Sequence, residues 1–126
     1  MRKILVVEDE GYLAKMYEKK FLNMGYEVRL ASNGEAGCTA MLEYHPDIVL
    51  LDIKMPVLDG YGFIDRVKKN ADLAKIPIVV VTNLSLAETK EELIGRGVAD
   101  CIEKTAVTPK QLAERIEEIL GRDGRT

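Results

Sequence analysis

Short apolar runs recur along the chain, separated by segments whose apolar residues follow a helical period. Three runs contain only Ile, Leu and Val, and they occupy residues 4–7, 48–51 and 78–81. Unbroken runs of this length are typical of strands buried on both faces. Residues 26–30 instead alternate apolar and charged side chains, which predicts an edge strand. A fifth, shorter strand is predicted near residues 101–102.

Helices are predicted between these strands. The first begins near Leu13 and ends at Gly25, which suits a C-cap, and the second runs from Asn33-Gly34 to about Tyr44. The predicted inward stripe of the first helix is Leu13, Met16, Tyr17, Phe21 and Met24. After the strand at 48–51, Asp52 and a turn containing Pro56 lead to a third helix. Its predicted inward residues are Phe63, Ile64 and Val67.

Two further helices complete the pattern. The fourth is predicted over Leu86 to Gly95, with Leu93 and Ile94 as its inward residues. The fifth begins at Thr108-Pro109, a Thr N-cap followed by Pro at the first helical position, and Gly121 predicts its end. The predicted apolar face of this last helix consists of Leu112, Ile116, Ile119 and Leu120.

Five strands that alternate with five helices predict an α/β domain with a doubly wound parallel sheet. Connections between parallel strands are right-handed, and the three apolar strands belong in the middle of the sheet. The strand order 2-1-3-4-5 satisfies both conditions. We expect one domain over residues 1–121, followed by a polar tail at 122–126.

The composition narrows the range of functions. The 126 residues are 47% hydrophobic and 31% charged, with a net charge of −3, which argues against a broad basic surface for nucleic acid. No apolar run reaches the roughly 18–20 residues that span a bilayer, and the N-terminus does not resemble a signal peptide. Cys38 and Cys101 are expected to be free thiols. We therefore expect a cytoplasmic protein.

Polar residues follow the predicted strands where ligands bind in open α/β sheets. Glu8, Asp9 and Glu10 follow the first strand and Asp52 follows the third. Thr82-Asn83 and Lys104 come after the fourth and fifth strands. Because parallel strands end at the same edge, we expect these side chains to converge. Glu10 also suits plain solvent exposure or the capping of a helix.

These residue types suit phosphoryl transfer. Carboxylates at close range repel each other, and a hard cation such as Mg²⁺ or Mn²⁺ removes that cost. Asp9 and Asp52, with Glu8 directly or through water, could hold such an ion. The carboxylate of Asp52 could become an acyl phosphate. Lys104 and Thr82 could then bind phosphoryl oxygens.

The residues that carry this site also carry a family resemblance. Four blocks, Ile4 to Glu10, Val49 to Gly60 (VLLDIKMPVLDG), Pro77 to Thr82 and Cys101 to Lys104, resemble the receiver domain of bacterial two-component response regulators. The resemblance covers essentially the whole chain and is nearest to the single-domain chemotaxis regulators. It implies a flavodoxin-like fold with no output domain in these 126 residues.

The resemblance implies that Asp52 accepts a phosphoryl group from a phosphohistidine on a sensor histidine kinase or a histidine phosphotransfer domain. Glu8 and Asp9 match the acidic pair of the family, and the backbone carbonyl of Lys54 would complete the Mg²⁺ shell. Thr82 and Lys104 match its hydroxyl and its lysine.

Phosphorylation is then expected to move Thr82 and to alter the face of the fourth helix, fifth strand and fifth helix for a downstream effector. A weak or phosphorylation-linked homodimer is a further possibility. Apart from its own phosphorylation and dephosphorylation, the domain is not expected to be an enzyme.

Three residues depart from the pattern of the family. Cys101 replaces the aromatic residue whose rotamer usually follows the threonine, so it is too small for that switch. Thr105 replaces the proline after the lysine, so the peptide bond before it is either trans or strained. Asn83 stands where a small residue is common and could narrow access to the phosphoryl group.

Other functions remain open. Cys101 and Thr105 favour a pseudo-receiver that binds partners without phosphorylation. A metal-dependent phosphohydrolase is weaker, because Lys54 stands where a second aspartate would be needed, and there is no cap domain. A nucleotide-binding fold is weaker still, since Glu8 to Gly11 is acidic where a glycine-rich phosphate loop is required.

Overall fold

The computed structural model describes residues 2–55, 57–83 and 86–122. Pro56 and residues 123–126 of the predicted tail lie outside the described residues. The elements in chain order are β1 (Lys3–Val7), α1 (Gly11–Asn23), β2 (Glu27–Ala31), α2 (Gly34–Tyr44), β3 (Ile48–Leu51), α3 (Gly60–Lys68), β4 (Ile78–Thr82), α4 (Leu86–Gly95), β5 (Asp100–Glu103), a 3₁₀ turn (Lys104–Ala106) and α5 (Pro109–Arg122). The predicted alternation of strands and helices is confirmed.

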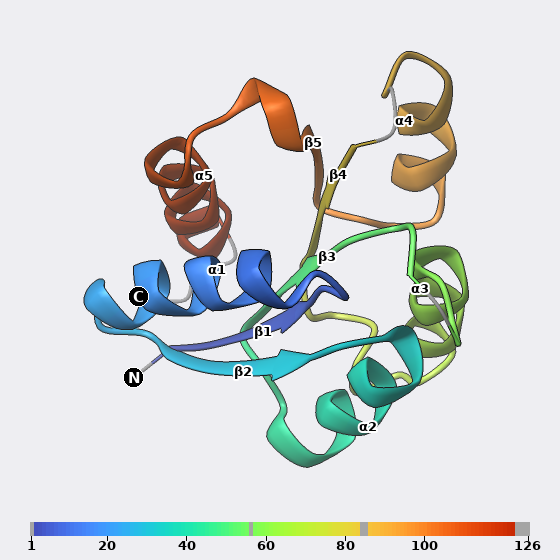
Figure 1. The fold of residues 1–126 in the computed structure, drawn as a ribbon. Coiled ribbons are helices and arrows are strands. Elements are labelled where there is room, and N and C mark those ends of the chain that lie inside the picture. The colour runs from blue at the N-terminus through green and yellow to red at the C-terminus, as the bar shows by residue number, and fades with distance from the viewer. Residues whose placement is uncertain (1, 56, 84–85, 123–126) are drawn as a thin grey trace.

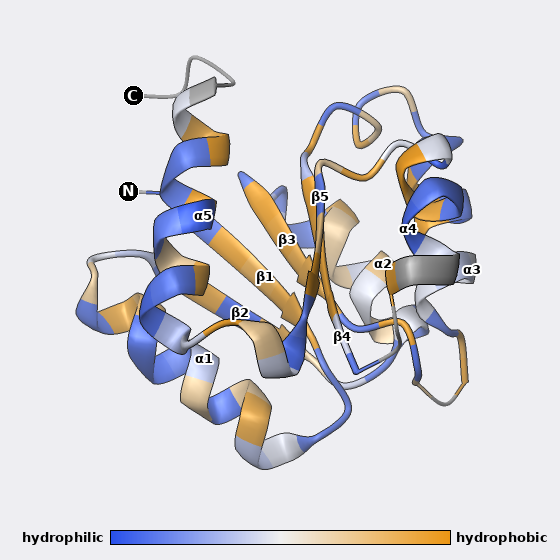
Figure 2. Cartoon of the chain, turned by 90° about the horizontal axis from the view of Figure 1, so that it is seen from above, coloured by the Kyte–Doolittle hydropathy of each residue, from blue (hydrophilic) through white to orange (hydrophobic). Residues whose placement is uncertain are grey.

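The five strands form one parallel sheet in the order β2-β1-β3-β4-β5, as predicted. Helices α1 and α5 cover one face of the sheet, and α2, α3 and α4 cover the other (Figure 1). The central strands β1, β3 and β4 are apolar except for Lys3 at the start of β1 and Thr82 at the end of β4, whereas β2 at the edge alternates apolar and charged residues (Figure 2). The chain therefore adopts the expected doubly wound, flavodoxin-like α/β fold.

Several helix ends follow the sequence signals. The Asn33 side chain accepts a hydrogen bond from the Ala36 amide at 2.8 Å, which caps α2. The Thr108 hydroxyl accepts from the Gln111 amide at 3.1 Å, and the Gln111 side chain accepts from the Thr108 amide at 2.9 Å. This reciprocal pair is a capping box at the start of α5. Gly25, just after α1, has a φ of +91° and allows the chain to leave the helix.

The predicted inward faces of two helices, α1 and α4, are partly wrong. Helix α1 packs through Ala14, Tyr17 and Phe21, whereas Met16 is 38% exposed because it lies on the opposite side of the helix. Met24 is also exposed, since α1 ends before it.

The end of α4 also differs from the prediction. Leu93 is fully buried, but Ile94 is 46% exposed, because one residue along a helix turns the side chain by about 100°. Gly121 does not end α5, which continues to Arg122. Within the described residues, no helix is both long enough and apolar enough to cross a membrane.

Candidate functional site

Three carboxylates meet where β1 and β3 end. One oxygen from each of Glu8, Asp9 and Asp52 lies within 4.8 Å of the other two. Glu8 and Asp52 are buried, at 4% and 6% exposure, whereas Asp9 is exposed. The backbone holds them there, because the Asp52 amide donates to the carbonyl of Val7 at 3.0 Å, one step beyond the strand ladder. The predicted convergence of these acids is therefore present.

Lys104 reaches this cluster from the end of β5. Its Nζ lies 2.9 Å from Glu8 Oε1 and 3.4 Å from Asp52 Oδ2, and its side chain is only 8% exposed. The second carboxylate oxygen of Glu8 accepts a hydrogen bond from the Glu10 amide at 3.2 Å. The single ammonium thus contacts both buried acids and is closer to Glu8. The sequence could not reveal this preference, since neither strand spacing nor residue type determines which acid lies nearer.

Burial and mutual contact shift the pKa values of Glu8 and Lys104. Burial raises the pKa of Glu8 to about 7, and the nearby charge of Asp52 adds to the rise, although the hydrogen bond from Lys104 opposes it. Burial alone would lower the pKa of Lys104, but its interaction with Glu8, followed by the charge of Asp52, raises that pKa overall. The lysine therefore stays charged, whereas the buried Glu8 carboxyl keeps its proton to a higher pH than an exposed glutamate does.

The loop after Asp52 is held by tight backbone contacts. Asp52 Oδ1 accepts a hydrogen bond from the Ile53 amide at 2.8 Å, and the Gly60 amide donates to the Ile53 carbonyl at 2.8 Å. A Cβ at Gly60 would lie 2.7 Å from the Ile53 Cα, and one at Gly34 would lie 2.2 Å from the Leu58 carbonyl oxygen. Both glycines therefore allow the close backbone packing that supports the site.

The remaining predicted residues differ in their exposure. Thr82 is buried as the last residue of β4, while Asn83 and Lys54 are exposed. Cys101 is buried on the face covered by α2, α3 and α4, where burial raises its thiol pKa to about 11. All peptide bonds among the described residues are trans, including the bond between Lys104 and Thr105.

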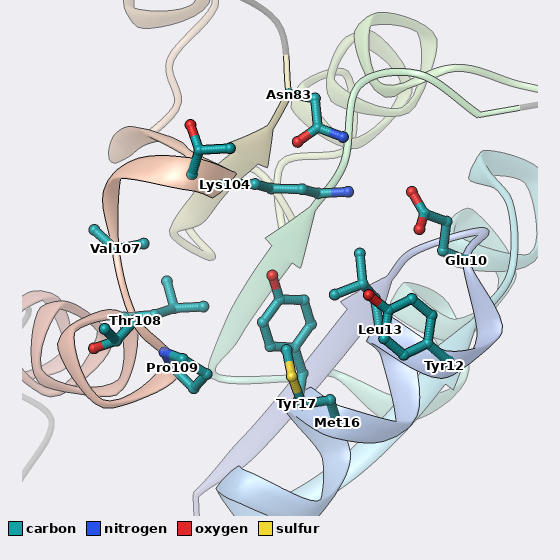
Figure 3. Close-up of a pocket in the computed structure, with 12 residues that line it drawn as sticks. Glu10, Tyr12, Leu13, Met16, Tyr17, Asn83, Lys104, Val107, Thr108 and Pro109 are labelled. Atoms are coloured by element: carbon teal, nitrogen blue, oxygen red, sulfur yellow. The ribbon is translucent and has the colours of Figure 1, made fainter.

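A pocket of about 370 Å³ opens beside Lys104, between α1 and the segment that leads into α5. Glu10 and Asn83 lie at its rim near the ammonium, and Tyr17 reaches up from α1 toward Lys104 (Figure 3). Tyr12, at the start of α1, is 75% exposed. The site therefore opens onto a surface with aromatic as well as charged residues.

The acidic group fits a divalent cation with oxygen ligands. Oxygen ligands of Mg²⁺ lie about 2.1 Å from the ion, so two of them are separated by no more than roughly 4.2 Å. The observed spacing of up to 4.8 Å needs only small rotations of the carboxylates to reach that value. Glu8, Asp9 and Asp52 supply hard anionic oxygens, which Mg²⁺ and Mn²⁺ prefer over softer ligands.

Comparison with known proteins agrees with this geometry. Residues 4–117 match the family described as the response regulator receiver domain. A probable transcriptional regulator, ycf27, from Pyropia yezoensis is 37% identical over 121 residues, which cover 95% of this chain and 48% of that protein. The chain thus spans about half the length of the curated relatives that it matches.

Solved structures have the same fold. The chemotaxis protein CheY4 of Vibrio cholerae superposes with a TM-score of 0.88 at 26% identity, covering 95% of this chain and 99% of that one. The receiver domain of a sensor histidine kinase from Pseudomonas aeruginosa has a TM-score of 0.85 at 25% identity, covering 95% and 98%. That structure contains a magnesium ion coordinated in its active site cleft.

Proposed function

Because the chain belongs to the response regulator receiver domain family, we propose that Asp52 accepts a phosphoryl group from a phosphohistidine. The observation that carries this proposal is the contact of one buried lysine with both Glu8 and Asp52, beside a third carboxylate. In this proposal Asp52 is the nucleophilic carboxylate, Lys104 is the fixed cation, and Glu8, Asp9 and Asp52 itself supply oxygen ligands for Mg²⁺. These are the groups that phosphoryl transfer requires.

In the proposed reaction, a carboxylate oxygen of Asp52 attacks phosphorus, and the bond from phosphorus to the imidazole nitrogen of the donor breaks. The electron pair of that bond leaves with the imidazole, and Asp52 becomes an acyl phosphate. Mg²⁺, held by Asp9, Asp52, Glu8 and the Lys54 carbonyl, would neutralise charge on the phosphoryl oxygens. Lys104 would turn from Asp52 to a phosphoryl oxygen, and Thr82 would donate its hydroxyl to another.

The proposed output is a change in the surface made by α4, β5 and α5. The movement of Thr82 and Lys104 toward the phosphoryl group would initiate this change. A sensor histidine kinase or a histidine phosphotransfer domain would supply the phosphoryl group, and a downstream effector in the cytoplasm would recognise the altered surface. The longer transcriptional regulators among the relatives suggest that this effector acts in transcription. A phosphorylation-linked homodimer would use the same surface.

The alternative of a pseudo-receiver is not supported. A binding module without phosphorylation would not need Glu8, Asp52 and Lys104 to be held together, yet these three are buried in mutual contact. Cys101 lies in the core under α2, α3 and α4, and Thr105 follows Lys104; with both residues present, the contacts of Lys104 with Glu8 and Asp52 are complete. The two substitutions bear on the output and not on the acceptance of a phosphoryl group.

The test is phosphorylation by a small donor. The protein would be incubated with acetyl phosphate and Mg²⁺, and intact mass spectrometry would detect a gain of one phosphoryl group, about 80 Da. The Asp52→Asn variant should show no gain, and removal of Mg²⁺ with EDTA should suppress the gain in the wild type. The absence of labelling in the wild type, where another receiver domain is labelled in parallel, would contradict the proposal.

A further inference from the structure

Glu103 stands at the junction between the site and the fifth strand. It is the last residue of β5, it lies opposite Thr82 in the parallel register, and it directly precedes Lys104. A displacement of Thr82 therefore reaches the backbone of Glu103 across the pairing of β4 with β5. A displacement of Lys104 reaches it through the peptide bond that joins the two residues. The Glu103 side chain is only partly exposed.

The carboxylate of Glu103 bridges β5 and α4. Its Oε1 accepts a hydrogen bond from the backbone amide of Leu86 at 2.9 Å, and Leu86 is the first residue of α4. The first amides of a helix have no acceptor within the helix, and a negative charge there also interacts favourably with the helix dipole. Glu103 thus supplies an acceptor to α4 across 17 residues of chain.

This bridge lies on the side of the sheet where the usual aromatic switch is missing. Alternation along β5 puts Cys101 and Glu103 on the same face, and Cys101 packs in the core under α2, α3 and α4. Among the residues of α4 whose burial is described, few pack against the rest of the protein. Leu93 is fully buried, whereas Leu86 is half-buried and Ile94 is exposed.

We propose that Glu103 is a positioning residue that couples phosphorylation of Asp52 to the start of α4, in place of the aromatic residue absent at position 101. This inference rests on the proposed function, because the coupling needs a phosphorylated Asp52. In the unphosphorylated protein, the bond from Leu86 to Glu103 holds the first turn of α4 against β5. When Lys104 turns to the phosphoryl group and Thr82 follows, Glu103 shifts with them, and this bond breaks.

The experiment is hydrogen exchange of the amides of α4, measured by NMR with and without beryllofluoride and Mg²⁺, which mimic the phosphoryl group. In the wild type, beryllofluoride should accelerate exchange in the first turn of α4. In Glu103→Ala, exchange there should already be roughly fivefold faster without beryllofluoride, as expected for the loss of a cap, and beryllofluoride should add little. Glu103→Gln keeps an acceptor oxygen and should behave nearly as the wild type.

The matched control is Glu91→Ala, which removes the same charge from the exposed face of α4 and should retain the response to beryllofluoride. The proposal is overturned if the first turn of α4 exchanges in Glu103→Ala at the wild-type rate, or if Glu103→Ala keeps the full response to beryllofluoride. It is also overturned if Glu103→Gln behaves as Glu103→Ala does. Failure of the proposed function would look different. The wild type would then gain no mass from acetyl phosphate, while the effect of Glu103→Ala without beryllofluoride would remain measurable.

Discussion

The acidic cluster and the corner between α4 and β5, where the last turn of α4 with Ile94 and Gly95 leads into β5, differ in how tightly they are packed. At the cluster, Glu8 and Asp52 are almost fully buried, and a single Cβ added at Gly60 would overlap with backbone atoms. At the corner, Ile94 is 46% exposed, and a Cβ at Gly95 would meet no atom within 4 Å. Phosphoryl chemistry needs fixed geometry, whereas a surface that changes needs room to move.

The largest expected effect tests this difference in packing directly. Gly60→Ala should lower the free energy of unfolding by about 3 kcal/mol, because its Cβ would lie 2.7 Å from the Ile53 Cα and 2.8 Å from the Asp52 carbonyl oxygen. The matched variant, Gly95→Ala, should raise it by about 0.5–1 kcal/mol, since alanine favours helix and the space is open. Urea unfolding followed by circular dichroism measures both, and equal effects would contradict the proposed difference.

A somewhat smaller loss is expected when the cation is removed from the cluster. Lys104→Met should lower the free energy of unfolding by about 2 kcal/mol without Mg²⁺, less than the roughly 3–5 kcal/mol for a fully uncompensated buried charge, because Glu8 can take up a proton once it lacks its positive partner. Mg²⁺ should restore more stability to the variant than it adds to the wild type. Thermal unfolding with EDTA or with Mg²⁺ measures this, and an unchanged melting temperature in EDTA would show that the ion pair does not hold the cluster.

The pH dependence of the metal-free protein should show the cost of burying Glu8. The folded-state pKa of Glu8, about 7, is higher than its ordinary value of 4.5, so the folded protein binds the proton more tightly than the unfolded chain does. Stability should therefore fall as the pH rises from 6 to 8, by about 1 kcal/mol, or roughly 4 °C in Tm. The isosteric Glu8→Gln variant should lose this dependence, and the same slope in both proteins would assign it to another group.

The smallest effect concerns the loop that follows Asp52. Val57 has a φ of +71° and is 78% exposed, so its β-branched side chain strains the backbone and makes little compensating contact. Val57→Asn should raise the free energy of unfolding by about 0.5–1 kcal/mol, because asparagine tolerates this conformation. Chemical denaturation measures the gain. A loss of stability would mean that the Val57 side chain contributes more than its exposure suggests.

The two regions also differ in how well the sequence predicted them. The apolar runs of β1, β3 and β4 identified the central strands, and the residues directly after them identified the acidic cluster. At the corner, the weak apolar stripe of α4 led to the wrong side chain, Ile94, as an inward residue. A helix with few apolar positions allows several rotations about its axis, and only packing against the sheet selects one.

The residue order alone determined the five strands, the parallel sheet and the edge at which the acids, Thr82 and Lys104 gather, because hydrophobic periodicity and chain connectivity are local properties. Only the tertiary structure decided that Lys104 lies nearer to Glu8 than to Asp52, and that Glu103 reaches the first amide of α4. These contacts join residues 17 to 96 positions apart. They depend on side-chain rotamers and on the rotation of helices against the sheet, which no local pattern in the sequence encodes.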